Sequence, residues 1–315
     1  MIVTLTPNPS IDRTITLGGP LRRGGVQKAT STGDQHGGKG VNISRACLAA
    51  GLSTVAVLPA HEEDPFVVGL RHSGVECRPV PPAGPIRTNI TITEPDGTTT
   101  KVNTPGARVT PEHTEAMARA VTDLAPHSAW TVLAGSLPPG AESTFYADAA
   151  QRLHPTPTKV AVDTSGAALA SLAAALPVAA PDLMKPNGEE LASLTGVDPV
   201  ALEADPLAVA AAAQALVRRG AGAVLASLGA NGAVLATAEG SWHATPPPTT
   251  VVSTVGAGDS SLFGYLLADQ RGLDAPGRLA MAVAYGSAAA ALPGTTVPTP
   301  DQVNPDLVTV TVLGG

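Results

Sequence analysis

A glycine-rich run that ends in an aspartate is the strongest chemical signal in this sequence. Residues 252–268 read VSTVGAGDSSLFGYLLA, so an extended β-branched run leads into Gly256, Ala257, Gly258 and Asp259 and an apolar helix follows. Glycines at a helix start leave backbone N–H groups uncovered, and these groups together with the helix dipole favour an anion. A carboxylate beside such a site is suited to take a proton from a hydroxyl group that attacks phosphate. The alternative is that Asp259 only caps the helix.

A second glycine-rich loop, TSTGDQHGGKGVNISRA at residues 30–46, comes close to a nucleotide-binding motif. Gly33, Gly38 and Lys39 have the spacing of a P-loop, but Gly40 stands where a P-loop needs the hydroxyl group that holds Mg²⁺. Asn42 follows at the start of an expected helix, where its amide can hydrogen-bond hydroxyl groups. The loop therefore predicts a ligand other than the phosphates of a nucleotide.

Polar residues elsewhere in the chain fit such a ligand. Asp12 follows the first expected strand, and a carboxylate can accept hydrogen bonds from two sugar hydroxyl groups at once. Arg87 offers a guanidinium fork for a phosphate and Asn89 offers an amide. The combined set suits a phosphorylated polyol and comprises Asp12, Gly38, Lys39, Asn42, Arg87 and Asn89.

Two further segments could serve a nucleotide, although each also has a purely structural interpretation. In KPNGEEL, Lys185 can neutralise phosphate, while Asn187 and Glu190 are oxygen donors suited to Mg²⁺ or its waters; the same two residues also fit a capping box. SLGANGAV at 227–234 predicts a strand, a tight turn and a second strand, and the turn could lie under a nucleotide or only connect the strands. The turn residues are Ser227, Leu228, Gly229, Ala230, Asn231 and Gly232.

The rest of the chain alternates between strands and helices, which predicts an α/β fold with a mostly parallel sheet covered on both faces. Two stretches, about 11–36 and 86–106, differ, because they show glycine pairs, Thr-rich alternation and an Asp-Gly hairpin signal. We expect short antiparallel strands there, forming a lid inserted in a single domain of residues 1–315. Helices are expected from 42 to 52, around 111–124 and 142–153, at 206–219, and through most of 257–292.

Composition excludes several classes of partner. The net charge is −7 and no dense Lys/Arg run exists, which argues against a nucleic-acid partner. No apolar stretch is long enough to span a membrane, and the N-terminus does not resemble a signal peptide, so a cytoplasmic protein is expected. The two cysteines, Cys47 and Cys77, are expected to be free thiols, and the seven histidines show no metal-ligand spacing.

Seven motifs, taken together and in this order, resemble the ribokinase-like, or PfkB, carbohydrate kinases from residue 1 to about residue 300. Within that family, TPNPSID and GSLPPG are typical of the branch that phosphorylates phosphosugars, and Lys39, VVSTVGAGDS and EPDGTTTKVN are most similar to its 1-phosphofructokinase members. The seven motifs are TPNPSID, GGKGVN, GSLPPG, DTSG, KPNGEEL, SLGANGA and STVGAGDS.

The resemblance implies a three-layer α/β/α core with a β-sheet lid, ATP and Mg²⁺ as the cofactors, and a homodimer formed through the lid. Asp259 would be the base, and the amides from Gly256 to Asp259, including those of Ala257 and Gly258, would hold the transferring phosphoryl group. Asn187 and Glu190 would position Mg²⁺ through water. Lys185, Asn187, the turn from Ser227 to Gly232, and Gly258 would bind ATP, while Asp12, Gly38, Lys39, Asn42, Arg87 and Asn89 would bind the sugar phosphate.

The implied reaction is phosphorylation of a ketohexose monophosphate, with fructose 1-phosphate as the first choice of acceptor. Tagatose 6-phosphate, fructose 6-phosphate and a free sugar are the alternatives, and Thr91 weakens the choice because some relatives have lysine there; Lys101 or Arg108 could compensate. A non-catalytic sugar-phosphate sensor is a rival of another class, against which Asp259 argues. A dinucleotide-dependent oxidoreductase is disfavoured, since Ser261 occupies the position of the third fingerprint glycine.

Overall fold

A computed structural model describes residues 1–314, and its centre is a ten-stranded sheet. The strand order is β14-β13-β12-β11-β10-β9-β8-β1-β4-β5. The part from β11 to β5 is parallel, while β12, β13 and β14 are antiparallel additions at one edge. The strands are β1 (Ile2–Leu5), β4 (Thr54–Pro59), β5 (Glu76–Val80), β8 (Trp130–Ala134), β9 (Lys159–Asp163), β10 (Leu183–Met184), β11 (Ala223–Ser227), β12 (Ala233–Thr237), β13 (Gly240–Thr245) and β14 (Thr309–Gly314).

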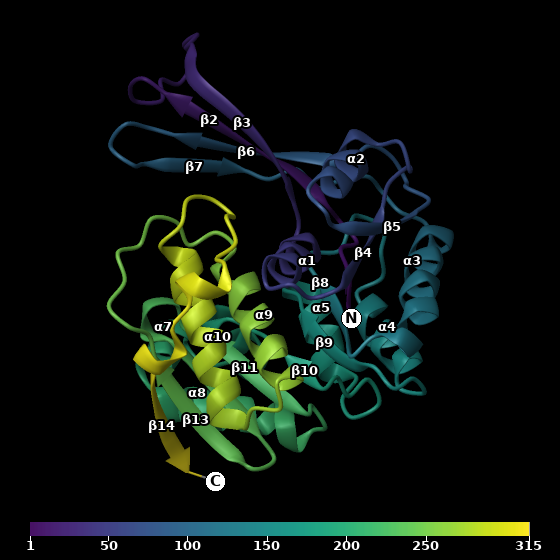
Figure 1. The fold of residues 1–315 in the computed structure, drawn as a ribbon, viewed down its shortest axis with the longest axis vertical. Helices are drawn as coiled ribbons and strands as arrows, with labels where there is room; N and C mark the ends of the chain where they lie inside the picture. The colour runs from purple at the N-terminus through teal and green to yellow at the C-terminus, as the bar shows by residue number, and fades with distance from the viewer. Residues whose placement is uncertain (315) are drawn as a thin grey trace.

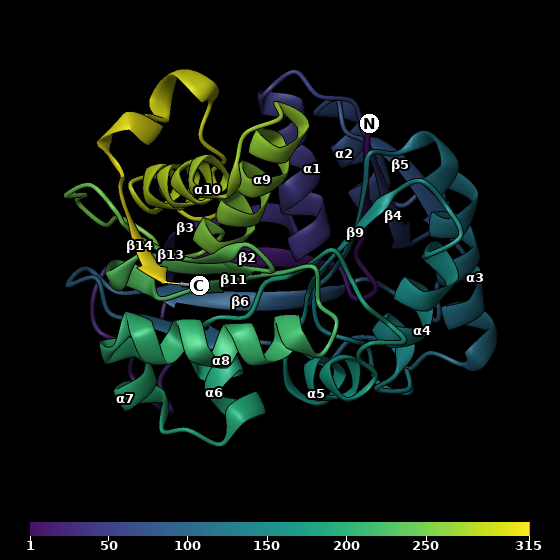
Figure 2. The ribbon, with the colours of Figure 1, turned by 90° about the horizontal axis from the view of Figure 1, so that it is seen from below.

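Helices cover both faces of this sheet, as Figure 2 shows. One apolar cluster joins the sheet to α3 through α8, and a second joins its other face to α1, α9 and α10. The expected three-layer α/β/α core is therefore confirmed. The helices are α1 (Lys39–Ala49), α2 (Pro65–His72), α3 (Pro111–Leu124), α4 (Phe145–Leu153), α5 (Gly166–Ala174), α6 (Gly188–Thr195), α7 (Pro199–Ala204), α8 (Pro206–Arg218), α9 (Ala257–Gln270) and α10 (Ala275–Ala290), with short 3₁₀ turns at Ala125–His127, Gly229–Asn231, Pro300–Gln302 and Pro305–Leu307.

A separate four-stranded sheet, called the small sheet here, projects from the core (Figure 1). Its order is β3-β2-β6-β7, with β2 (Ser10–Leu17), β3 (Ala29–Gly37), β6 (Arg87–Thr93) and β7 (Thr99–Val102). Both hairpins are antiparallel as expected, and the two hairpins are joined by parallel pairing of β2 with β6, which the sequence did not predict. The segment from α1 to β5 separates the two hairpins in the sequence. Local turn signals do not determine how hairpins this far apart pair with each other.

Helix α1 begins three residues earlier than the glycine-rich sequence indicates. It starts at Lys39 rather than Asn42, directly after Gly38, whose φ of +129° is a conformation that favours glycine. Gly40 lies inside the first turn of α1. Only glycine fits there, because a Cβ would come within 2.5 Å of Thr6 Oγ1 and 2.9 Å of the Leu5 carbonyl oxygen. Close packing on β1 therefore outweighs the low helix propensity of glycine.

The core is built mainly from alanine, valine and leucine, since aromatic residues are few. Its aromatic contacts include an edge-to-face pair, Phe263 and Tyr285, between α9 and α10. Cys47 and Cys77 are buried and free, as expected. Within residues 1–314, no helix combines the length and apolar character that crossing a membrane would require.

Candidate active site

Several candidate residues lie at the carboxyl ends of the parallel strands of the main sheet. Asp163 is the last residue of β9, Lys185 follows β10 directly, and Ser227 ends β11. Lys39 and Asn42 come from α1, and Asp259 comes from the first turn of α9, on the face covered by these two helices. Ligands of open α/β sheets bind at the carboxyl ends of the strands, so this edge is the expected position of a site.

Asp259 is nearly buried and does not cap its helix. The N-cap of α9 is Gly256, with φ of +80°, and no side chain caps this helix end. Instead, Asn42 Nδ2 donates a hydrogen bond of 2.8 Å to Asp259 Oδ2. Burial, followed by repulsion from Asp163, raises the pKa of Asp259 to about 6. The capping interpretation is therefore wrong, and a carboxyl group with this pKa can accept a proton near neutral pH.

Backbone amides without a hydrogen-bond partner in the described chain lie at the same helix start. The first amide to bond within the α9 region is that of Ser260, which donates to the Gly256 carbonyl oxygen at 2.9 Å. The amides of Gly258 and Asp259 precede it and have no intrahelical partner, whereas that of Ala257 points back to Thr254 O at 3.4 Å. The helix start therefore offers N–H groups to an anion beside Asp259.

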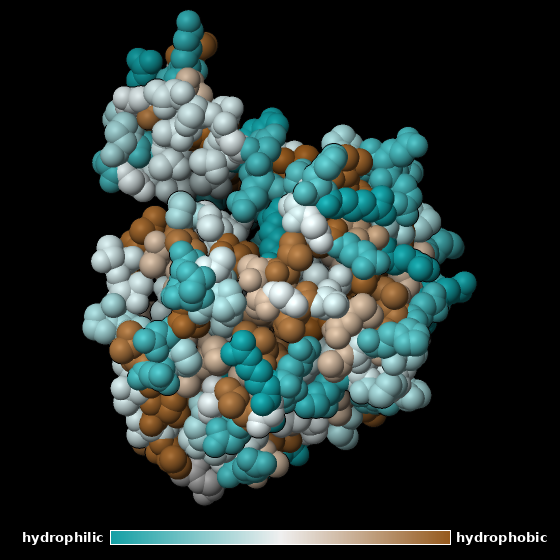
Figure 3. Space-filling model, in the orientation of Figure 1, coloured by the Kyte–Doolittle hydropathy of each residue, from teal (hydrophilic) through white to brown (hydrophobic). Residues whose placement is uncertain are grey.

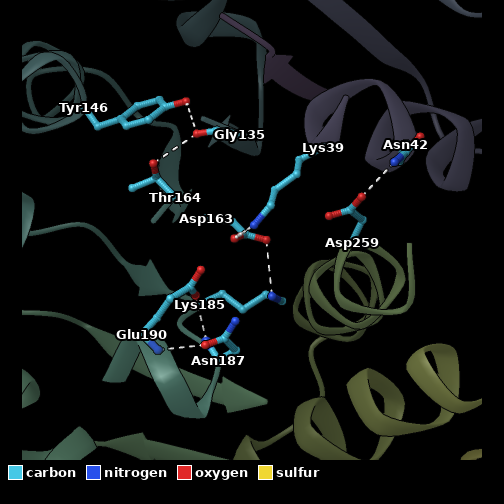
Figure 4. A network of polar contacts seen from close by, with 10 residues as sticks. All are labelled: Lys39, Asn42, Gly135, Tyr146, Asp163, Thr164, Lys185, Asn187, Glu190 and Asp259. Atoms are coloured by element: carbon cyan, nitrogen blue, oxygen red, sulfur yellow. Dashed lines mark hydrogen bonds and ion pairs between the residues drawn. The ribbon is translucent and has the colours of Figure 1, made fainter. Parts of the chain in front are cut away.

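Two lysines meet the buried carboxylate of Asp163 close to Asp259, as Figure 4 shows. Lys39 Nζ lies 2.5 Å from Asp163 Oδ1, and Lys185 Nζ lies 3.2 Å from Asp163 Oδ2. Asp163 is completely buried, and the Lys185 side chain is 5% exposed. Two cations and two carboxylates thus occupy the point where β9, β10, α1 and α9 meet.

The charges of this cluster stabilise one another. Burial alone would raise the pKa of Asp163, but Lys185 and Lys39 outweigh burial and hold that pKa below its usual value. Burial alone would likewise lower the pKa of Lys39, but Asp163 and Asp259 outweigh it, so the pKa of the ammonium group is raised. Lys39 and Asp163 therefore remain charged throughout the neutral range.

A second group of candidate residues lies where the small sheet joins the core. Asn89 Nδ2 donates to Asp12 Oδ1 at 3.0 Å, and these residues are direct partners on β6 and β2. Arg87 Nη1 donates to the Thr104 carbonyl oxygen at 2.8 Å, while its buried Nε has no partner within the described chain. Gly37, at the end of β3, lies directly against the Asp12 carboxylate, so a side chain at this position would displace that carboxylate.

Arg87 also lines a cleft of about 610 Å³. Its walls are the segment from Asn103 to Pro105, the loop after β8 and the start of α5. Ser136 and Ser165 contribute to the lining, and Ser165 lies two residues after Asp163. The space-filling view shows the surface hollowed between the small sheet and the core (Figure 3).

The near-P-loop spacing is coincidental. Gly33 lies within β3 of the small sheet, so Gly33 and Lys39 do not belong to one strand-to-helix loop. Gly40 is also too closely packed for the serine or threonine of a P-loop. Lys39 extends from the start of α1 to Asp163, not into the small sheet.

The small sheet also places a cation opposite Thr91. Thr91 pairs with Lys101 in the register of β6 and β7, and directly paired residues project from the same face. Alternation along β6 puts Arg87, Asn89 and Thr91 on this face as well. Lys101 therefore provides a positive charge on the face where Thr91 lacks one.

The two segments considered for a nucleotide lie next to each other. Ser227 N donates to the Pro186 carbonyl oxygen at 3.0 Å, and Asn187 and Ser227 form an isolated parallel bridge. In the turn that follows, Gly229 and Gly232 have φ of +56° and +85°; Leu228 is buried, whereas Gly229, Ala230 and Asn231 are exposed. The turn accordingly offers mainly backbone atoms to a ligand.

Asn187 and Glu190 form a complete capping box at the start of α6. Asn187 Oδ1 accepts from Glu190 N at 2.8 Å, and Glu190 Oε2 accepts from Asn187 N at 2.9 Å. Glu190 Oε1 keeps its acceptor capacity, and within residues 1–314 no cluster of three or more His, Cys, Asp or Glu residues could form a metal cage. This donor set fits Mg²⁺, which is commonly held by one or two carboxylates, substrate phosphates and water.

Sequence reasoning missed Asp163 as a site residue, although its motif was noticed. The signal that could have found it is KVAVD, a buried strand with a carboxylate as its last residue, followed by a turn. The cleft residue Ser136 was missed for the same reason, because it follows β8 at the same sheet edge.

Along most of its length the chain is similar to known carbohydrate kinases. The model of the pfkB family carbohydrate kinases matches residues 6–302. The chain is 34% identical to a 1-phosphofructokinase of Rhodobacter capsulatus, over 99% of this chain and 97% of that one. It is 37% identical to a 1-phosphofructokinase of Xanthomonas campestris, over 89% and 88%.

Solved structures of phosphofructokinases have a similar fold. Phosphofructokinase-2 from Escherichia coli in complex with substrates and products superposes with a TM-score of 0.86 at 30% identity, covering 96% of each chain. A tetrameric inhibited form of that enzyme superposes with a TM-score of 0.84 at 29% identity, covering 93% of this chain and 95% of that one. On the matched family model, the sequence identities and the arrangement of its candidate site, the chain belongs to the pfkB family of carbohydrate kinases and is a sugar kinase.

Proposed function

We propose that this kinase transfers the γ-phosphoryl group of ATP to O6 of fructose 1-phosphate and forms fructose 1,6-bisphosphate. The observation that carries the proposal is the position of Asp259, a carboxylate with a raised pKa that lies beside the unpaired amides of α9 and near the two lysines on Asp163. The names of the 1-phosphofructokinases to which the chain is similar support this choice of acceptor.

Asp259 accepts the proton of the O6 hydroxyl group as O6 attacks the γ-phosphorus. The new bond joins O6 to phosphorus, the bond from phosphorus to the β,γ-bridging oxygen breaks, and ADP leaves with that oxygen. Asn42 holds the carboxylate through Oδ2, which keeps Oδ1 available to the hydroxyl group. The amides of Gly256, Gly258 and Asp259, together with Lys39 and Lys185, stabilise negative charge on the transferring group, and the Ala257 amide joins them if it releases Thr254 O.

Arg87 is the proposed ligand of the acceptor's own phosphate. Its buried Nε lacks a hydrogen-bond partner in the described chain, and an unpaired buried donor is costly unless a ligand satisfies it. Asp12, Asn89, Gly38 and Asn42 would then receive the sugar hydroxyl groups, and Lys101 adds positive charge on the same face of the small sheet. This division places the phosphate at one end of the acceptor and the reacting hydroxyl at the other.

ATP would lie along the carboxyl ends of β10 and β11, over the turn from Ser227 to Gly232, with Lys185 and Gly258 near its phosphates. A Cβ at Gly258 would lie 3.2 Å from Lys185 Nζ, so glycine leaves room for that ammonium group at the helix start. Asn187 and Glu190 would hold Mg²⁺ through water, and the ion would supply positive charge to the phosphates of ATP.

Three features of the whole protein belong to the same proposal. The chain forms one domain, in which the segments 11–36 and 86–106 act as a lid over the acceptor. Two chains form a homodimer through the small sheets. The protein works in the cytoplasm, which its two free thiols support.

The proposal is tested by ADP release from Mg-ATP with fructose 1-phosphate, fructose 6-phosphate, tagatose 6-phosphate and free fructose in parallel assays. We expect the highest kcat/KM with fructose 1-phosphate. A higher value with another phosphosugar would replace the acceptor but keep the kinase chemistry. Absence of ADP release with all four sugars would overturn the proposal.

A further inference from the structure

Asp163 is the charged residue of this centre for which no role has been given. It is completely buried, it ends β9, and among residues 1–314 it is the group that forms ion pairs with both lysines of the centre. Lys39 comes from the loop and helix assigned to the acceptor, whereas Lys185 comes from the segment assigned to ATP. The carboxylate therefore lies at the junction between the two substrates.

We propose that Asp163 is a positioning residue that ties the acceptor-side Lys39 to the donor-side Lys185 and so determines where both ammonium groups meet the transferring phosphoryl group. This inference rests on the function proposed above. Asp163 acts through the lysines and does not itself touch either substrate.

The surroundings of Asp163 support such a role because they hold its backbone rigidly. Its carbonyl oxygen accepts from Gly135 N at 2.9 Å. The Gly135 carbonyl oxygen in turn accepts from Tyr146 at 2.8 Å and from Thr164 Oγ1 at 3.0 Å, and all of these groups are buried (Figure 4). A fixed strand end therefore carries the anchor, whereas the two lysine side chains alone would be flexible.

The geometry also explains why an ion pair with two cations is useful here. Lys39 and Lys185 share Asp163 as their counter-ion. The three groups together therefore carry one net positive charge. Three charged side chains act on Asp259: Lys39 from α1, Asp163 from β9 and Lys185 from the segment after β10. Because both lysines pair with Asp163, they do not pair directly with Asp259. The Asp259 carboxylate therefore remains available as a base.

The test is the variant Asp163→Asn, which keeps the size of the side chain and removes its charge. We expect kcat with fructose 1-phosphate to fall about 10²-fold, the scale expected when reacting groups are misplaced by about 1 Å. We also expect the acidic limb of the pH profile of kcat/KM to move to lower pH, because the repulsion that raises the pKa of Asp259 is gone. The matched control is Thr164→Val, which removes a buried hydrogen bond from the same strand end but no charge, and it should leave the limb in place.

The limb shift reports the charge of Asp163 beside Asp259, and a fall in kcat beyond that of Thr164→Val reports the placement of the two lysines. If Asp163→Asn lowers the rate but leaves the limb where Thr164→Val leaves it, or if it keeps full activity, the inference is wrong. If raised Mg²⁺ restores the rate, Asp163 serves the metal ion rather than the lysines, and the inference is again wrong.

A second variant keeps the inference testable if Asp163→Asn does not fold. Lys39→Met removes a cation that lowers the pKa of Asp259, so the limb should move the opposite way, to higher pH, and Lys39→Arg should restore its position. An unmoved limb in Lys39→Met would contradict the geometry.

An NMR titration of the Asp259 carboxyl carbon in the ligand-free protein reports the same shifts without turnover. The NMR result therefore stands even if the wild-type protein releases no ADP, which is the outcome that would instead overturn the proposed function.

Discussion

Asp259 is held by one hydrogen bond and surrounded by three charges, so its replacement tests the chemistry directly. Asp259→Asn keeps the size of the side chain but cannot accept the hydroxyl proton, and we expect kcat to fall by about 10²–10⁴, the usual contribution of a general base. ADP release by stopped-assay chromatography measures it, with unchanged ATP affinity as the control for folding. A variant with near wild-type kcat would remove Asp259 from the mechanism.

The pH dependence of the wild-type protein follows from the same residue. Only the deprotonated carboxylate serves as base, and its pKa is raised to about 6 by burial and by Asp163. Hence kcat/KM should rise with pH through the region near 6 and then level off, whereas an unperturbed aspartate would place that limb near 4. A flat profile between these values would contradict the raised pKa.

Arg87 tests the choice of acceptor. Arg87→Met removes the donor with an unpaired buried Nε, and we expect binding of fructose 1-phosphate to weaken by about 1.5–3 kcal/mol, the scale of a hydrogen bond to a charged group. Phosphorylation of free fructose, if measurable, should change little, and Lys28→Met on the exposed connection between β2 and β3 should change neither. An equal loss with phosphorylated and free sugar would assign Arg87 to the scaffold.

Among individual residues, sequence reasoning found those with an unusual motif and missed the one with an ordinary motif. Asp259 and Lys39 are flanked by glycines, and glycine clusters are informative because few backbones require them. No glycine cluster precedes Asp163 in the sequence. Only the parallel pairing of β8, β9 and β10 brings this residue to Lys39 and Lys185. Contacts across more than a hundred residues are not encoded in local spacing.

At the scale of single elements, the capping box of α6 allows one helix end to be tested for two roles. Asn187→Ala removes a hydrogen bond to Glu190 N, and we expect a loss of about 1 kcal/mol in the free energy of unfolding. If Asn187 also positions Mg²⁺, the variant should need more Mg²⁺ for half-maximal rate. The comparison is Asp274→Ala, which removes the cap of α10 at Gly277 N, away from these strand ends. Equal Mg²⁺ dependence in both variants would leave Asn187 as a cap only.

Element types were predictable where periodicity is strong and less so where packing decides. The helix expected around 111–124 matches α3, and the one expected at 206–219 matches α8 within one residue. Helix α5 was not among the expected helices because its hydrophobic residues are not confined to one face, and β10 is just two residues long. The start of α1 was displaced because contacts of Gly40 with β1, rather than propensity, determine it.

At the scale of the whole molecule, the layered core follows from alternation of strands and helices, whereas the two faces of the small sheet are defined only by its strand pairing. Alternation along the small sheet puts Asp12 and Asn89 on one face and a set of apolar residues on the other. In the register, Ile15 pairs with Ile92 and Ile90 pairs with Val102, which is half exposed. This outer apolar face comprises Ile15, Ile90, Ile92 and Val102.

A second copy of the chain is the occupant that we propose for the outer apolar face, because packing two such faces removes both from water while leaving each polar face toward its own acceptor. Light scattering after gel filtration should therefore give a dimer for the wild-type protein. Ile90→Asp buries a charge at the centre of the face and should give a monomer. Val178→Asp, at an exposed valine near α5, is the matched control and should remain dimeric. A wild-type monomer, or a dimer that survives Ile90→Asp, would place the interface elsewhere.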